Sequence, residues 1–227
     1  SHYSQGSVAA IGNGNQIMNI IILVLSSMTV ATTVLISRYF GAGDPEKAKS
    51  VSNASIYSLS FFSIVVTLLI YGFQRPLFQW LQVPNDILDE TCSYTVIVST
   101  CILIQAIYMV FASILRSHKL MKYVTFVAII MNTLNILGNA ILINGLFGFP
   151  RLGIIGAAIS TNISKFIGLV IIILVFLKKT NMGLGFLNLK YFSFKMAKKV
   201  LLIAVPSGGE AFSYQMSQLI ILRFVNT

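Results

Sequence analysis

A single acidic residue lies within a long apolar stretch of this chain, and it is the first candidate for chemistry. Glu210 occurs in KVLLIAVPSGGEAFSYQMSQLI at 199–220, while the other five acids lie in more polar segments. An ionisable group at the centre of a membrane helix costs about 2.5–3.5 kcal/mol, so its presence there indicates a function. Pro206 and the glycines before the acid favour a loosened or kinked helix, and Tyr214 follows on the same face. Such a carboxylate can exchange a proton or ion and attract a lipophilic cation, whereas its alternative role is bonding between helices.

Uncharged amides form a second candidate, in the apolar stretch 123–144. Asn132, Asn135 and Asn139 are spaced by three and four residues, which places them within about 60 degrees of one another on a helix. Such a stripe can line a cavity for a substrate or an ion, or it can bond across helices for about 0.6 kcal/mol per residue. The sequence leaves both roles open.

Lys165 is the other ionisable residue inside an apolar stretch, ISTNISKFIGLVIIILVF at 159–176. Its long side chain can reach toward the membrane surface or bond to a neighbouring helix. We therefore keep Lys165 as a candidate binding residue, although the sequence favours a structural role for it.

Residue patterns typical of enzymes and metal sites are not found. The chain has two histidines, His2 and His118, and its two cysteines, Cys92 and Cys101, lack the paired spacing of a metal site. No glycine-rich phosphate loop precedes a helix. We therefore expect no catalysis, no metal centre and no cofactor apart from a coupling ion, Na⁺ or H⁺.

The composition shows which elements must position these residues. Hydrophobic residues make up 56% of the chain and charged residues 10%, whereas a soluble domain carries about 25% charged residues. A helix of about 20 apolar residues crosses the hydrocarbon layer of a membrane. We therefore predict an all-α, polytopic bundle of transmembrane helices. The predicted spans are 11–37, 51–73, 92–115, 123–144, 154–177 and 200–222.

The basic residues predict the orientation of this bundle. Twelve of the sixteen fall in alternate breaks between the spans: Arg38, Lys47, Lys49, Arg116, Lys119, Lys122, Lys178, Lys179, Lys190, Lys195, Lys198 and Lys199. The opposite breaks hold only Arg75 and Arg151, and they also carry three acids. By the positive-inside rule the twelve residues face the cytoplasm. The net charge of +10 thus reflects membrane topology and does not predict a nucleic-acid partner.

Four segments resemble segments of proteins in one known family. VATTVLISRYFGAGDPEKAK at 30–49 resembles their second helix and the turn after it. IIMNTLNILGNAILINGLFGFPRLGIIGAAISTNIS at 129–164 resembles their fifth helix, outer loop and sixth helix. VPNDILDETCSYTVIVS at 83–99 is similar to the start of the fourth helix, and IAVPSGGEAF at 203–212 to the seventh.

The family that these four segments resemble is that of the multidrug and toxic compound extrusion (MATE) exporters. The resemblance implies that the six spans are helices two to seven of a twelve-helix transporter with two lobes and a V-shaped cavity. Residues 1–177 would form the N-terminal lobe without its first helix, 178–199 a cytoplasmic interlobe linker, and 200–227 the first helix of the C-terminal lobe. It also implies secondary active export of organic cations in exchange for Na⁺ or H⁺. Glu210 matches an acid of the family's seventh helix, whereas the fifth-helix acid of some members is Asn139 here.

The remaining expectations concern partners and location. We expect a multi-pass protein of the inner (plasma) membrane, monomeric at full length, which contacts small organic cations and membrane lipids but no nucleic acid. One alternative is a lipid-linked oligosaccharide or polysaccharide flippase of the same superfamily, whose cavity usually carries several basic residues. Another is a membrane scaffold or sensor that transports nothing.

Overall fold

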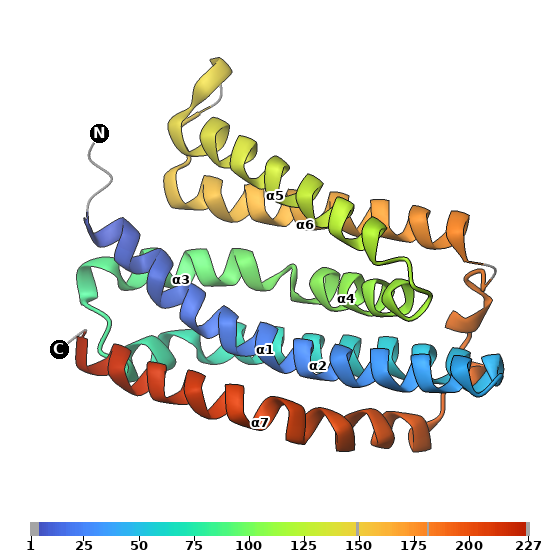
Figure 1. Cartoon of the computed structure of the whole chain (residues 1–227). Coiled ribbons are helices and arrows are strands. Elements are labelled where there is room, and N and C mark those ends of the chain that lie inside the picture. Colours follow the sequence, from blue (N-terminus) through green and yellow to red (C-terminus); the bar gives the residue numbers. More distant parts are fainter. Residues whose placement is uncertain (1–4, 149, 181, 226–227) are drawn as a thin grey trace.

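The chain folds into a bundle of long helices (Figure 1). A computed structural model describes residues 5–148, 150–180 and 182–225. Within these residues the structure contains helices and no strands, which confirms the all-α prediction. The α-helices are α1 (Gln5–Gly41), α2 (Pro45–Trp80), α3 (Asn85–Ser99), α4 (Ile102–Ser117), α5 (Met121–Asn144), α6 (Gly153–Lys179) and α7 (Phe194–Val225). Short 3-10 turns occur at Leu146–Gly148, Gly185–Leu187 and Leu189–Tyr191.

The helices lie roughly side by side in layers (Figure 1). α1, α2 and α4 contact one another in the middle, α5 pairs with α6 on one side, and α7 lies on the opposite side against α1 and α2. α6 also contacts α3 and α4 and thereby joins the outer pair to the middle of the bundle.

Helices occupy all six stretches predicted to span the membrane. In the described part of the chain, α1, α2, α5 and α6 are long and apolar enough to cross a bilayer, and α3 with α4 adds a fifth, bent span. α7 has sufficient length at 32 residues, but serines, glutamines and glycines interrupt its apolar residues, so it is not among the described helices that are apolar enough to cross a bilayer. The described residues therefore form four apolar helices of spanning length, a fifth span if α3 and α4 cross the membrane together, and the long helix α7.

The third predicted span, 92–115, is broken into two helices that meet at 41°. Two hydroxyl groups at the break donate to carbonyl oxygens three residues earlier, Ser99 to Val96 (2.8 Å) and Thr100 to Ile97 (2.7 Å). Such bonds compete with the regular helical ladder, which accounts for the bend. Sequence hydropathy did not predict this break, because the residues around it are apolar.

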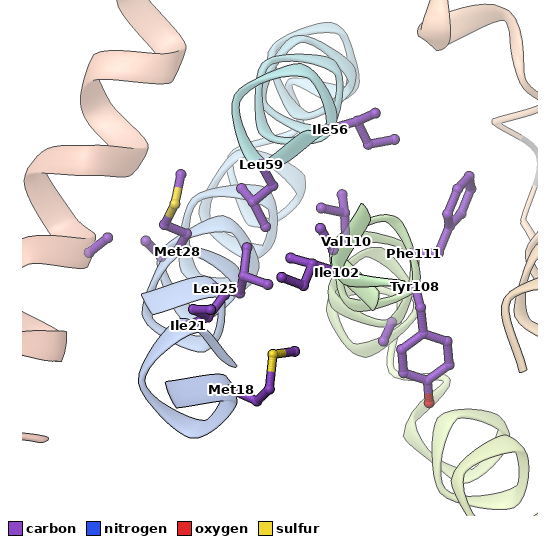
Figure 2. Packing of buried hydrophobic residues seen from close by; sticks show 14 of the residues in the cluster. Met18, Ile21, Leu25, Met28, Ile56, Leu59, Ile102, Tyr108, Val110 and Phe111 are labelled. Atoms are coloured by element: carbon purple, nitrogen blue, oxygen red, sulfur yellow. The ribbon is translucent and has the colours of Figure 1, made fainter. Parts of the chain in front are cut away.

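Buried apolar side chains fill the space between α1, α2 and α4. Figure 2 shows Met18 and Leu25 of α1, Leu59 of α2, and Ile102 and Val110 of α4 pointing toward a common interior. The relative exposure of these side chains is 4% or less. This core fixes the three helices on which the outer layers pack.

The segment 180–193 between α6 and α7 is attached to α2. Buried Asn53 of α2 donates from Nδ2 to the carbonyl oxygens of Phe186 (2.6 Å) and Asn188 (3.0 Å). The Tyr57 hydroxyl donates to the carbonyl oxygen of Leu187 at 2.6 Å. These bonds satisfy carbonyl groups that would otherwise be costly to bury, and they hold the connection against the bundle.

An aromatic contact reinforces that attachment. The Phe186 ring lies 5.8 Å from the Phe176 ring and 6.4 Å from the Phe111 ring, in edge-to-face orientations. The connection is shorter than the predicted linker 178–199, because α6 continues to Lys179 and α7 already begins at Phe194.

The turn between α1 and α2 follows the residues that the sequence singled out. Gly43 has a φ of 70°, and the Asp44 side chain caps α2 by accepting from the Lys47 backbone N–H at 3.1 Å. Pro45 occupies the first turn, where its missing N–H costs nothing. The side-chain hydrogen bond from Lys47 holds the pKa of the Asp44 carboxyl below its usual value. We call the end of the bundle formed by this turn, the α4–α5 turn and the 180–193 connection the basic end.

Labelling of single cysteines tests the orientation. In a cysteine-free full-length protein, Glu46→Cys and Lys122→Cys lie at the basic end and are expected to be protected from an impermeant thiol reagent added outside. Asp86→Cys is expected to react. We choose position 86 for the outward-facing cysteine because the Asp86 side chain is exposed, whereas the side chain of the next residue, Ile87, is buried and a cysteine there would not reach the reagent. Labelling of position 46 from outside, with position 86 protected, would reverse the predicted topology.

Candidate functional site

Small residues bring α5 and α6 close together. A Cβ atom added at Gly156 of α6 would lie 2.7 Å from the carbonyl oxygen of Leu142 in α5. One added at Gly138 of α5 would lie 2.4 Å from the Ser160 hydroxyl oxygen of α6. Both distances are shorter than ordinary contacts, so a side chain at Gly156 would push the two backbones apart and one at Gly138 would displace the Ser160 hydroxyl. Close backbones allow short polar side chains to bond across the two helices.

A cluster of amide and hydroxyl groups occupies this contact, and we call it the amide–hydroxyl cluster: Asn135, Asn139, Ser160 and Thr161. Asn135 Nδ2 donates to Thr161 Oγ1 at 3.1 Å, and Asn139 Nδ2 donates to Asn135 Oδ1 at 3.3 Å. The Ser160 hydroxyl donates to the backbone oxygen of Asn135 at 3.0 Å. Two of the three predicted asparagines thus join the same network.

One acceptor in the cluster has no donor. Asn139 Oδ1 is buried and accepts no hydrogen bond from the described part of the chain. Leaving a buried acceptor unpaired costs about 1–3 kcal/mol. A cation that binds amide and hydroxyl oxygens would compensate that cost. The cluster is neutral, so it can bind an ion but cannot release a proton.

The third predicted asparagine, Asn132, lies apart from this network. Its side chain is exposed on the surface of α5, about two turns from Asn139 along the helix. Helical spacing placed the three residues on one broad face, but the close contact with α6 covers only part of that face.

Lys165 lies at the break between α3 and α4. From α6 this residue faces Cys101, the last residue of the break, and its side chain is partly buried. On the preceding turn of α6, Asn162 Nδ2 donates to the Ile97 carbonyl oxygen (2.6 Å) and to Thr100 Oγ1 (3.1 Å). Among the described residues Lys165 has no hydrogen bond or ion pair, so its ammonium group is available to an anion or a dipole.

The α7 candidates are placed differently. The backbone of Glu210 lies in α7, but its side chain is outside the described part of the structure. Tyr214 is 64% exposed. α7 remains one α-helix through Pro206, so the predicted loosening does not interrupt it. Its contact with α1 is close at Gly208, where an added Cβ would lie 2.4 Å from the Ser27 hydroxyl oxygen.

The candidates therefore form two separate groups. Asn135, Asn139 and Lys165 belong to the α5–α6 side of the bundle, whereas Glu210 and Tyr214 belong to α7 on the opposite side (Figure 1). The sequence did not predict Thr161, Ser160 or Asn162 as site residues, although the polar run STNIS at 160–164 was a usable signal. Across the described residues, no group of three or more His, Cys, Asp or Glu side chains could hold a metal ion.

Comparison with known families identifies the relationship. The MatE family model matches residues 1–141, which is more than half of the chain. This chain belongs to the MatE family. The predicted family is thereby confirmed, and the chain is a multi-pass protein of the cell membrane.

Two curated MatE relatives cover nearly all of the chain. The uncharacterized transporter YisQ of Bacillus subtilis is 36% identical over 225 residues, covering 99% of this chain and 50% of YisQ. The probable multidrug resistance protein NorM of Thermotoga maritima is 27% identical, covering 99% of this chain and 48% of NorM. The chain thus spans about half the length of these MatE relatives.

Solved structures agree on the fold. An inward-facing multidrug resistance MATE family transporter has a TM-score of 0.83 at 23% identity, covering 96% of this chain and 48% of that one. A Pyrococcus furiosus transporter, described as having a binding pocket of reverse polarity, has a TM-score of 0.78 at 20% identity, covering 98% of this chain and 55% of that one. At these identities the likeness shows the MatE fold alone.

Proposed function

We propose that the full-length protein is a secondary active exporter of small organic cations, which exchanges them for Na⁺ or H⁺ by alternating access. The proposal is supported by relatives named as probable multidrug resistance proteins, among them NorM of Thermotoga maritima and YoeA of Bacillus subtilis. In this proposal residues 1–177 contribute an N-terminal lobe, 178–199 the interlobe linker and 200–227 the first helix of a second lobe. The protein acts as a monomer without enzymatic activity, and its only cofactor is the coupling ion.

The observation that carries ion coupling is the unpartnered Asn139 oxygen in the amide–hydroxyl cluster. The side-chain oxygens of Asn135 and Thr161 belong to the same hydrogen-bond network as Asn139. A small cation that enters this network can exchange its water ligands for several protein oxygens. Because these groups do not titrate, the cluster suits Na⁺. Coupling to H⁺ requires an acid, and Glu210 is the one acid in the predicted spans.

The two candidate groups suit different tasks in this exchange. Tyr214 exposes an aromatic ring on α7, which can attract an organic cation through its negative face. The amide–hydroxyl cluster lies on the other side of the bundle and binds the ion. Separate sites on two lobes allow each ligand to favour a different orientation of those lobes.

Efflux of ethidium, a lipophilic cation, tests the proposal. Cells that express the full-length protein are expected to accumulate less dye than cells with an empty vector, and the difference is expected to collapse when the driving gradient is removed. Imposing a Na⁺ gradient and a pH gradient separately identifies the coupling ion. Equal accumulation with and without the protein under both gradients would contradict cation export.

A flippase for anionic, lipid-linked substrates is the second candidate. Lys165 favours it, because this cation has no acidic partner in the described residues and lies beside a helix break. In this case the reconstituted protein would move a fluorescent lipid-linked phosphate between leaflets and leave ethidium in place, and Lys165→Gln would stop the movement.

A further inference from the structure

A large apolar groove runs between α1, α2 and α7, away from the candidate residues on α5 and α6. Its volume is about 880 Å³, within the usual range of ligand sites of about 300–1,000 Å³. α1 contributes Leu23 and Val24, α2 contributes Phe61 and Phe62, and α7 contributes Leu201 and Val205 to its walls. Nearly all of its lining is apolar, so it suits a hydrocarbon chain.

The groove ends at the basic end of the bundle. Leu189 and Phe192 of the 180–193 connection and Phe194 at the start of α7 line it there. The bonds from Asn53 and Tyr57 hold that connection on α2. One end of the groove is therefore a fixed part of the fold and lies at the predicted cytoplasmic surface of the membrane.

Cations without acidic partners surround this end. Lys198 lies one turn after Phe194 on α7, on the same helical face as Val205, and Lys190 directly follows Leu189. Lys195 adds a third exposed ammonium group in the first turn of α7. In the described residues none of these three lysines forms a salt bridge, whereas Lys47 and Lys49 pair with Asp44 and Glu46.

Positive charge next to an apolar groove matches an amphiphile with a negative head. The start of a helix adds partial positive charge from its free N–H groups, and α7 begins at this point. An acyl chain alone gains little by leaving the surrounding lipid for the groove, so the charged head must provide the selectivity.

We propose that this groove binds an anionic phospholipid of the inner leaflet, with an acyl chain between α1, α2 and α7 and the phosphate beside Lys195 and Lys198. The bound lipid contacts both α2 and α7, because residues of both helices line the groove. This proposal concerns lipid binding and does not depend on the transported substrate or the coupling ion.

Quenching by brominated lipids tests the site locally. The full-length protein, with its native tryptophans replaced by phenylalanine, carries one new tryptophan, Phe61→Trp in the groove or Phe126→Trp on α5. Both phenylalanines are exposed, at 71% and 60%, so position 126 is a matched control. Vesicles contain phosphatidylglycerol and phosphatidylcholine in equal amounts, and only one of the two carries brominated acyl chains.

At position 61, brominated phosphatidylglycerol is expected to quench more strongly than brominated phosphatidylcholine, whereas at position 126 the two should quench equally. A lysine near an anionic lipid contributes about a fivefold preference. Lys198→Gln should therefore reduce the apparent affinity for phosphatidylglycerol about fivefold, and adding Lys195→Gln should reduce it again. Lys122→Gln removes a charge from the same end of the bundle but in the first turn of α5, away from the groove, and should have no effect.

Two results would overturn the proposal. Equal quenching by both lipids at position 61 would show that the groove does not select an anionic head. Absence of quenching by either lipid at position 61, with normal quenching at 126, would show that another part of the full-length protein covers the groove. Ethidium efflux by the parent full-length protein is a separate readout, so absence of that efflux together with an intact lipid preference at position 61 would count against the proposed function alone.

Discussion

Glu210→Gln in the full-length protein is expected to reduce gradient-driven efflux of ethidium to the level of cells without the protein. Glutamine retains the size and much of the hydrogen bonding of glutamate, but it neither binds a proton reversibly nor carries a negative charge. Glu210 is the one acid in the predicted spans, so no other carboxylate there can attract the organic cation beside Tyr214 or exchange a proton, even where the amide–hydroxyl cluster binds Na⁺. Efflux is measured across a range of external pH and Na⁺ concentrations, with protein abundance determined by immunoblot.

Glu46→Gln is the matched control for this substitution. Glu46 is exposed in the first turn of α2 and pairs with Lys49 at 2.7 Å, so its neutralisation removes an acid without affecting the membrane interior. Surface pairs of this kind contribute little to stability. If Glu210→Gln exports ethidium as well as the parent protein under every condition, Glu210 serves helix packing and coupling must use the amide–hydroxyl cluster.

Gly156→Ala is expected to have the largest effect on stability. The added methyl group would lie 2.7 Å from the Leu142 carbonyl oxygen, which already accepts from the Leu152 backbone N–H at 3.0 Å. Backbone atoms cannot move away as a flexible side chain can, so α5 and α6 must separate. Overpacking of this kind costs about 1–3 kcal/mol. The midpoint of thermal unfolding of the full-length protein in detergent should fall, and efflux should fall with it as the amide–hydroxyl cluster opens.

Gly72→Ala tests whether the effect is specific to the contact. Gly72 is also within a helix, but an added Cβ there meets nothing within 4 Å. Alanine favours a helix by up to about 1 kcal/mol over glycine, so this variant should be as stable as the parent or more stable. Equal unfolding midpoints for Gly156→Ala and Gly72→Ala would contradict the close packing of α5 on α6.

The positions of the helices were predictable because hydropathy is a local property. Each apolar stretch needs a helix to satisfy its backbone groups in lipid, and the structure has helices at all six stretches. The predicted ends of the helices were less accurate than their positions. The fifth predicted stretch, 154–177, corresponds to α6 at Gly153–Lys179, whereas the sixth, 200–222, begins six residues after the start of α7 at Phe194. Hydropathy did not predict the beginning of α7, because its first turns contain polar and basic residues.

Individual site residues were predictable by type but not by grouping. The spacing of Asn135 and Asn139 indicated a shared face, and the two side chains are indeed bonded to each other. The same spacing included Asn132, which is exposed. Periodicity identifies which residues share a face of a helix. How much of that face is buried depends on the neighbouring helix that packs against it.

The sequence by itself determined that this chain is a helical membrane protein of the MatE family, since composition, periodicity and motif residues are all local features of the chain. Only the tertiary structure decided which polar groups meet. Thr161 and Asn135 are 26 residues apart yet bonded, and Asn162 reaches the helix break at Thr100 across 62 residues. These contacts depend on how closely α6 approaches α5 and α4, and that distance is set by glycines and side-chain volumes on several helices at once.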